Sequence, residues 1–127
     1  MKTSELSLYK KTIELTTLLY TMVKDISRFG QVTIGKLVIK QTVGLIKNIS
    51  LANREKNKRE FHLNNFLSDF ESLKAELRIL YETENNLKRH IKNISKLIIE
   101  IESEATKWKN YKNNNENKVN VDINNKL

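Results

Sequence analysis

The stretch FLSDFESLKAELRIL, residues 66–80, decides the fold of this chain. Its large apolar side chains recur at spacings of four, three, four and three residues: Phe66, Phe70, Leu73, Leu77 and Leu80. This repeat places them along one face of an α-helix, in the heptad-like seam that helical bundles use. We therefore predict a helix over about residues 58–81, with Phe61 and Leu63 extending the seam toward its beginning.

Three further segments carry apolar residues at helical spacing, and polar or charged breaks separate the four. The segments cover about residues 5–27, 33–53 and 86–111. Their inward positions are predicted to be Ile13, Leu15, Leu18, Leu19, Met22 and Ile26; Ile34, Leu37, Val38, Leu45, Ile46 and Ile49; and Leu87, Ile91, Ile94, Ile98, Ile101, Ala105 and Trp108. Four amphipathic helices joined by short links favour an antiparallel up-down arrangement. The expected fold class is an all-α four-helix bundle.

Small residues provide boundary signals around the second helix. Gly30 can take the left-handed conformation that ends a helix, and Thr33 is a good N-cap for the helix that follows. Gly44 lies within that helix, where glycine costs about 1 kcal/mol relative to alanine. It either marks a close approach between helices or is simply tolerated.

The bundle is expected to occupy residues 1–112, because a chain of 127 residues is long enough for one domain and not for two. From residue 113 to residue 127 the sequence is rich in asparagine and loses its apolar periodicity. Such a segment buries too little apolar surface to fold by itself. We therefore predict a disordered C-terminal tail.

Composition excludes several classes of protein. The sequence has no cysteine, which rules out disulfides, thiolate metal sites and cysteine nucleophiles. The N-terminal residues are polar, unlike the apolar core of a signal peptide. No apolar run approaches the roughly 18 residues that a membrane span needs. We expect a cytoplasmic protein without a membrane partner.

No arrangement of residues points to catalysis, a metal or a cofactor. His62 and His90 lie on different predicted helices and lack the Glu-x-x-His spacing of di-metal bundles, so each is expected at the surface. Acidic residues such as Glu14 lie one turn from a cation, here Lys10, which favours solvated surface pairs. No Gly-x-Gly loop is present to hold a phosphate. We predict a binding protein and not an enzyme.

The charge pattern favours a polyanionic partner. The chain has 23 Lys and Arg against 15 Asp and Glu, a net charge of +8, which on a small domain is typical of nucleic-acid binding. No Asp or Glu occurs over residues 26–54. Four cations in this span, at spacings of four, seven and seven, lie near one face of the second helix: Lys36, Lys40, Lys47 and Arg54. Lys58 and Arg59, in the basic corner at residues 56–59, extend its far end.

A second basic group lies on the fourth predicted helix: Lys88, Arg89, Lys92 and Lys96. It is equally consistent with nucleic-acid contact and with a solvated face, since Glu100 and Glu102 follow closely. Aromatic residues do not interleave with either group, so stacking on single strands is unsupported. Recognition of a duplex or a folded RNA by shape and charge fits better.

Trp108 ends the apolar repeat of the fourth helix, between Lys107 and Lys109. Its place on the inward face indicates that it caps the bundle core. The alternative is a subunit interface, where tryptophan is enriched.

The order of several short motifs is similar to that of a known family. The motifs are Thr33-Ile34-Gly35, Ala52-Asn53, Leu73-Lys74-x-x-Leu77-Arg78, Ile101 and Trp108-Lys109. In this order they resemble the accessory variability determinant proteins of diversity-generating retroelements. Those proteins belong to a four-helix-bundle family that includes proteins encoded in intervening sequences of 23S ribosomal RNA genes. The resemblance covers about residues 9–109.

The resemblance implies a barrel-like homopentamer with a basic surface that binds nucleic acid, RNA or DNA, and the retroelement's reverse transcriptase. Together they would make the mutagenic complementary DNA of the element. By position it adds Lys74 and Arg78 to the candidate contacts, with pairing to Glu71 and Glu82 as the alternative. The predicted nucleic-acid-binding set is Lys36, Lys40, Lys47, Arg54, Lys58, Arg59, Lys74 and Arg78.

The sequence departs from the family pattern at two places. Phe29-Gly30 stands where the family often has Phe-Pro, and Thr106-Lys107 stands where small residues usually precede the terminal tryptophan. Ala52-Asn53-Arg54 looks closer to the retroelement branch than to the intervening-sequence branch. Two alternatives stay open: an intervening-sequence-type bundle without a reverse transcriptase partner, and a structural oligomer whose charge only keeps it soluble.

Overall fold

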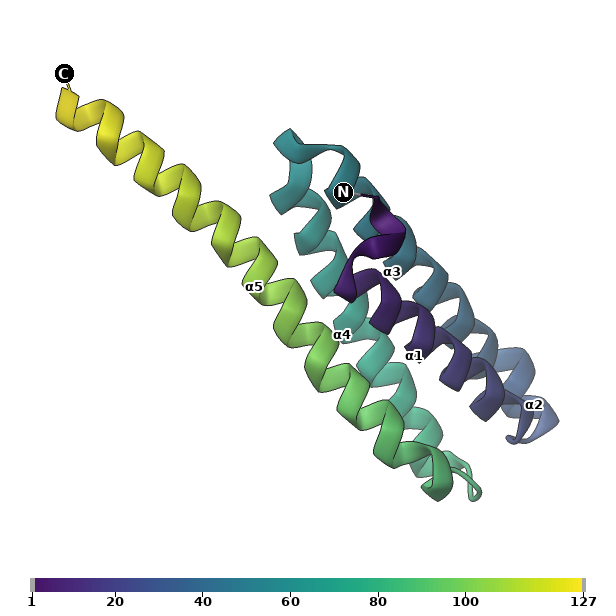
Figure 1. The fold of residues 1–127 in the computed structure, drawn as a ribbon. Helices are drawn as coiled ribbons and strands as arrows, with labels where there is room; N and C mark the ends of the chain where they lie inside the picture. Colours follow the sequence, from purple (N-terminus) through teal and green to yellow (C-terminus); the bar gives the residue numbers. More distant parts are fainter. Residues whose placement is uncertain (1, 127) are drawn as a thin grey trace.

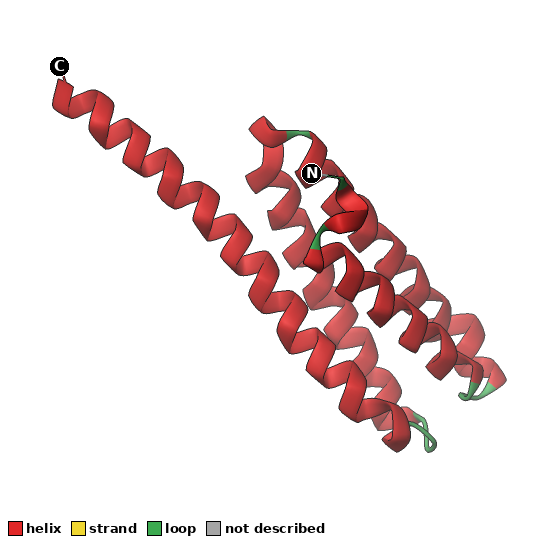
Figure 2. Ribbon diagram, in the orientation of Figure 1, coloured by secondary structure: helices red, strands yellow, loops and turns green. Residues whose placement is uncertain are grey.

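The computed structural model describes the backbone of residues 2–126 and the side chains of residues 2–111. Its long helices are α1 (Ser7–Lys24), α3 (Lys36–Arg54), α4 (Arg59–Thr83) and α5 (Lys88–Lys126). Shorter helical turns are η1 (Thr3–Glu5), α2 (Arg28–Gly30), η2 (Gln31–Gly35) and η3 (Lys56–Lys58). Successive long helices run in opposite directions (Figure 1), and only short loops join them (Figure 2). The all-α, antiparallel four-helix bundle is confirmed.

Each long helix packs against two others. α1 and α4 both contact α3 on one side and α5 on the other, and the most extensive contact joins α3 to α4. The seam predicted for α4 is confirmed, since Phe66, Phe70 and Leu73 are completely buried. The rings of Phe66 and Phe70 stack with their centroids 5.9 Å apart. The core formed around this seam runs the length of the bundle.

Three apolar residues predicted to face inward are instead exposed. Ile13, Leu37 and Phe61 have exposed fractions of 38%, 48% and 62%. The reason is geometric, because adjacent helical residues differ by about 100° around the axis. Leu37 immediately precedes the completely buried Val38, so it points well away from the core. The apolar arc of a helix is therefore wider than the arc that its neighbours cover.

The turn between the first two helices comes earlier than predicted. α1 ends at Lys24, and the Ser27 hydroxyl caps the next helix by accepting a hydrogen bond from the Gly30 N–H at 3.0 Å. Gly30 has φ −60° and ψ −41°, so the prediction of a left-handed helix end there was wrong. Thr33 is internal as well, and its hydroxyl donates to the Phe29 carbonyl at 2.6 Å. The helix continues from α2 through the π-helical turn η2 into α3.

The glycines of this region have steric roles that the sequence did not indicate. A Cβ atom at Gly30 would lie 2.8 Å from Glu84 Oε2. One at Gly35 would lie 2.9 Å from the Gly30 carbonyl oxygen and 3.0 Å from Val23 Cγ1. At Gly44 a Cβ would meet no neighbouring atom within 4 Å, so this glycine does not mark a close approach between helices.

The backbone of α5 continues beyond the bundle as far as Lys126, and Figure 1 shows its last turns extending past the other helices. The sequence predicted a disordered tail over residues 113–127, and this stays a prediction, although the backbone has helical geometry as far as Lys126. The segment contains no proline or glycine to interrupt a helix that has already begun. The side chains of residues 112–127 lie outside those described.

Candidate nucleic-acid interface

The four cations predicted on one face of the second helix lie on the outer face of α3. Their side chains are exposed, and they form what we call the α3 basic stripe: Lys36, Lys40, Lys47 and Arg54. The inner face of the same helix is defined by the buried Val38, Leu45 and Ile49. Because helical spacing places the stripe opposite these residues, the cations point into solvent and not toward neighbouring helices.

Intramolecular pairing leaves most of the stripe available. Among the described side chains, Lys36, Lys40 and Lys47 form no ion pair. α3 cannot neutralise itself, because no acidic residue lies between Asp25 and Glu55. The three ammonium groups are therefore able to bind an external anion without first breaking a salt bridge.

The two candidate contacts in the basic corner after α3, Lys58 and Arg59, differ in their surroundings. Lys58 is exposed, but Arg59 is engaged within the bundle. Arg59 Nε donates to the Ala52 carbonyl at 2.8 Å, and its guanidinium lies 5.0 Å from the centroid of the Trp108 ring. Arg59 thus satisfies a carbonyl at the end of α3 and makes a cation–π contact. Trp108 packs against the core, as predicted.

The two candidates taken from the family resemblance are paired with acids. Lys74 Nζ lies 2.6 Å from Glu71 Oε1 and 3.1 Å from Glu102 Oε1, so it links α4 to α5. These bonds, led by the one to Glu71, raise the pKa of Lys74. Arg78 Nε lies 3.1 Å from Glu82 Oε1. The structure therefore shows the intrahelical pairing that was the alternative interpretation, and it does not bring all eight candidates onto one face.

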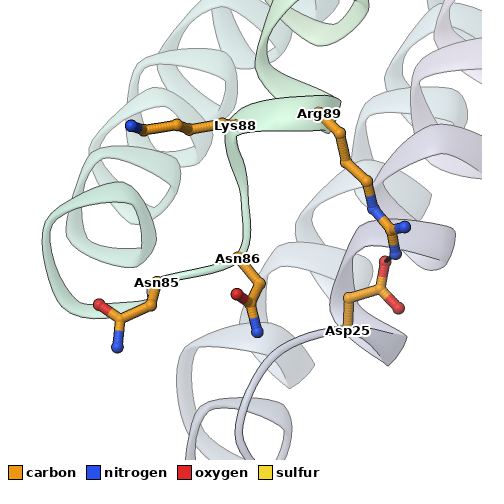
Figure 3. Close-up of a pocket in the computed structure, with 5 residues that line it drawn as sticks. All are labelled: Asp25, Asn85, Asn86, Lys88 and Arg89. Carbon is orange, nitrogen blue, oxygen red and sulfur yellow. Dashed lines mark hydrogen bonds and ion pairs between the residues drawn. The ribbon is translucent and has the colours of Figure 1, made fainter.

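A second polar site lies where the α1–α2 and α4–α5 turns meet. An open pocket of about 460 Å³ is lined by Asp25, Asn85, Asn86, Lys88 and Arg89. Figure 3 shows the Arg89 side chain reaching the carboxylate of Asp25, whereas Lys88 extends away from it. Of the α5 basic group, Arg89 therefore has an intramolecular partner, and Lys88, Lys92 and Lys96 are exposed.

Both histidines have partners that the sequence did not reveal. His62 has only 6% of its surface exposed, and its Nε2 lies 2.9 Å from Glu55 Oε2. His90 Nε2 lies 2.8 Å from Asp25 Oδ2, which joins the end of α1 to the first turn of α5. The prediction of a surface residue was wrong for His62, whereas His90 is partly exposed, with 13% of its side-chain surface accessible. No spacing signal identifies the Asp25–His90 contact, because the two residues are 65 positions apart.

The contacts of the Asp25 carboxylate should make part of the protein's stability sensitive to acid. Hydrogen bonds from Arg89 and then His90 hold the pKa of Asp25 below its ordinary value of 3.8. A carboxylate whose pKa is lowered on folding stabilises the protein above its unfolded pKa, and that stability is lost as the pH falls through the folded pKa. We expect Asp25→Asn to reduce the fall in melting temperature between about pH 4 and pH 2.

Thermal unfolding followed by circular dichroism at a series of pH values measures this effect. The matched control is Glu14→Gln, because Glu14 forms no ion pair among the described side chains. The melting temperature of this variant should vary with pH as that of the wild type does. An Asp25→Asn profile parallel to that of the wild type over the same range would contradict the prediction.

The fold defines this chain as a four-helix bundle, and its outer surface carries an uncompensated basic stripe. No protein-family model, curated protein or solved structure matches the chain. Within the described part of the chain, no helix is long and apolar enough to cross a membrane. The described side chains also contain no group of three or more histidines or carboxylates placed to hold a metal ion.

Proposed function

We propose that this protein is a nucleic-acid-binding accessory subunit of a diversity-generating retroelement reverse transcriptase. It would hold template RNA or complementary DNA on the outer face of α3 and so scaffold synthesis. The observation that supports binding is the α3 basic stripe, whose first three cations are exposed and form no ion pair within the described structure. The reverse transcriptase partner rests on the resemblance of the motif order to the accessory variability determinant family.

The geometry of the stripe suits a phosphate backbone. From Lys36 to Arg54 the helix rises about 27 Å, at about 1.5 Å per residue, so its cations form a straight row. Each phosphate that such a row neutralises releases condensed counterions, which makes binding weaken as salt is added. Four contacts predict a slope of about −4 for the logarithm of the duplex-DNA association constant against the logarithm of salt concentration.

Charge reversal of the stripe tests the proposal. We expect Lys40→Glu with Lys47→Glu to weaken binding of duplex DNA and structured RNA by about 100-fold or more at low salt, because two attractive contacts become repulsive. Fluorescence anisotropy of labelled nucleic acids across a salt series measures the affinity and its slope. The substitutions lie on an exposed face, so the melting temperature should stay close to that of the wild type.

The control for net charge is the double variant Lys10→Glu with Lys24→Glu. Both residues are exposed on α1, and the double variant loses the same amount of positive charge. The Lys10→Glu, Lys24→Glu variant should bind duplex DNA and structured RNA far more tightly than the Lys40→Glu, Lys47→Glu variant does. Equal affinities in the two folded variants would assign binding to net charge and would remove the stripe as the site.

A separate experiment tests the polymerase partner. Tagged protein should retain a retroelement reverse transcriptase when the two are co-expressed and purified after nuclease treatment. Retention after nuclease shows a direct protein contact. Nucleic-acid binding without retention would instead favour the intervening-sequence type of bundle.

A further inference from the structure

Gly44 lies in the middle of α3, where the bundle does not require a glycine. A Cβ atom at this position would meet no neighbouring atom within 4 Å, whereas a Cβ at Gly30 or Gly35 would approach another atom to less than 3.0 Å. A glycine inside a helix destabilises it relative to alanine. Packing within one molecule therefore explains Gly30 and Gly35 but leaves Gly44 unexplained.

The position of Gly44 places it beside the α3 basic stripe. Lys40 lies four residues before it and Lys47 lies three residues after it, so the three residues share one face of the helix. Lys40 and Lys47 are separated by about 10 Å along the axis, one on each side of Gly44. Both are exposed, and neither forms an ion pair among the described side chains.

The edge of this face toward α4 is closed by a polar contact. Asn48, four residues after Gly44, donates its side-chain amide to Asp69 of α4 at 3.0 Å. The Asp69 carboxylate is thereby held to the interface between the helices. The surface open to a partner is therefore a bare segment of helix backbone between two free ammonium groups.

We propose that the sugar–phosphate backbone of the bound nucleic acid crosses α3 at Gly44. The absence of a side chain lets the strand approach the helix backbone, while Lys40 and Lys47 bind phosphates on either side. The occupant is a polyanion because, among the described side chains of α3, the charged residues on either side of the bare segment are the exposed cations Lys40 and Lys47. This inference rests on the proposed nucleic-acid binding and locates its point of closest contact.

The test adds bulk at Gly44 without changing charge. Gly44→Gln should weaken binding of duplexes of about 20 base pairs, longer than the roughly 8 base pairs that α3 spans. We expect an affinity loss of about tenfold and a salt slope reduced by about 2, since lifting the strand removes the contacts of two lysines. The melting temperature should rise, because a better helix former replaces glycine in open space.

The matched control is Ala75→Gln, which places the same side chain at an exposed position of α4. This variant should bind duplex DNA and duplex RNA like the wild type. Unchanged affinity of Gly44→Gln, while the Lys40→Glu, Lys47→Glu variant loses binding, would overturn the crossing at Gly44 and leave the proposed function intact. If the wild-type protein bound neither duplex DNA nor duplex RNA at low salt, both the crossing at Gly44 and the proposed nucleic-acid binding would be overturned.

Discussion

Replacing Phe70 with alanine is expected to lower the free energy of unfolding by about 3–5 kcal/mol, the range typical of a buried phenylalanine. The Phe70 side chain is completely buried, and its ring stacks on that of Phe66 at a centroid distance of 5.9 Å. The substitution removes this contact and leaves a cavity at the centre of the core. Urea denaturation followed by circular dichroism measures the loss.

Phe61→Ala is the matched control on the same helix. Phe61 is 62% exposed, and among the described aromatic pairs its ring meets only that of His62, in a T-shaped arrangement with centroids 5.4 Å apart. We expect its replacement to change stability by no more than about 0.5 kcal/mol. If Phe61→Ala and Phe70→Ala lowered the free energy of unfolding by similar amounts, the buried apolar seam of α4 would extend to Phe61.

Alanine at Gly35 and at Gly44 should have opposite effects on stability. At Gly35 the new methyl group would lie 2.9 Å from the Gly30 carbonyl oxygen, so the backbone or Val23 must shift. Overpacking of this kind costs about 1–3 kcal/mol. At Gly44 the methyl group enters open space, and the helix gains about 0.5–1 kcal/mol from the loss of glycine.

Thermal and urea unfolding of the two single variants compare these effects within one continuous helix. Because the substitution is the same, the difference in unfolding free energy reports the surroundings of each glycine. Stabilisation by Gly35→Ala would show that η2 relaxes without cost. Destabilisation by Gly44→Ala would mean that α3 has neighbours at Gly44 that the structure does not contain.

The helix that contains Gly35 begins at a contact with a distant part of the chain. Ser27 begins this helix, and its N–H and hydroxyl both donate to the Glu84 carboxylate at 2.8 Å and 2.9 Å. Glu84 lies 57 residues away in sequence and follows the last turn of α4. The helix therefore begins at a position set partly by a residue from another part of the chain.

The sequence by itself determined the class of fold. The four-and-three spacing of Phe66, Phe70 and Leu73 predicts the buried face of α4, because the period of a helix is a local property of the chain. The absence of acidic residues over residues 26–54 likewise predicts an unneutralised face on α3, since helical neighbours lie three or four positions apart.

Only the tertiary structure decided which polar groups meet. The pairing of Lys74 with Glu102, the contact of His90 with Asp25 and the space at Gly44 all depend on how separate helices pack. Sequence spacing specifies the angle of a residue around its own helix, but not the register or distance of the neighbouring helix. For this reason the basic stripe was predictable from the sequence, whereas the partners of Lys74, Asp25 and His90 and the open surface at Gly44 were not.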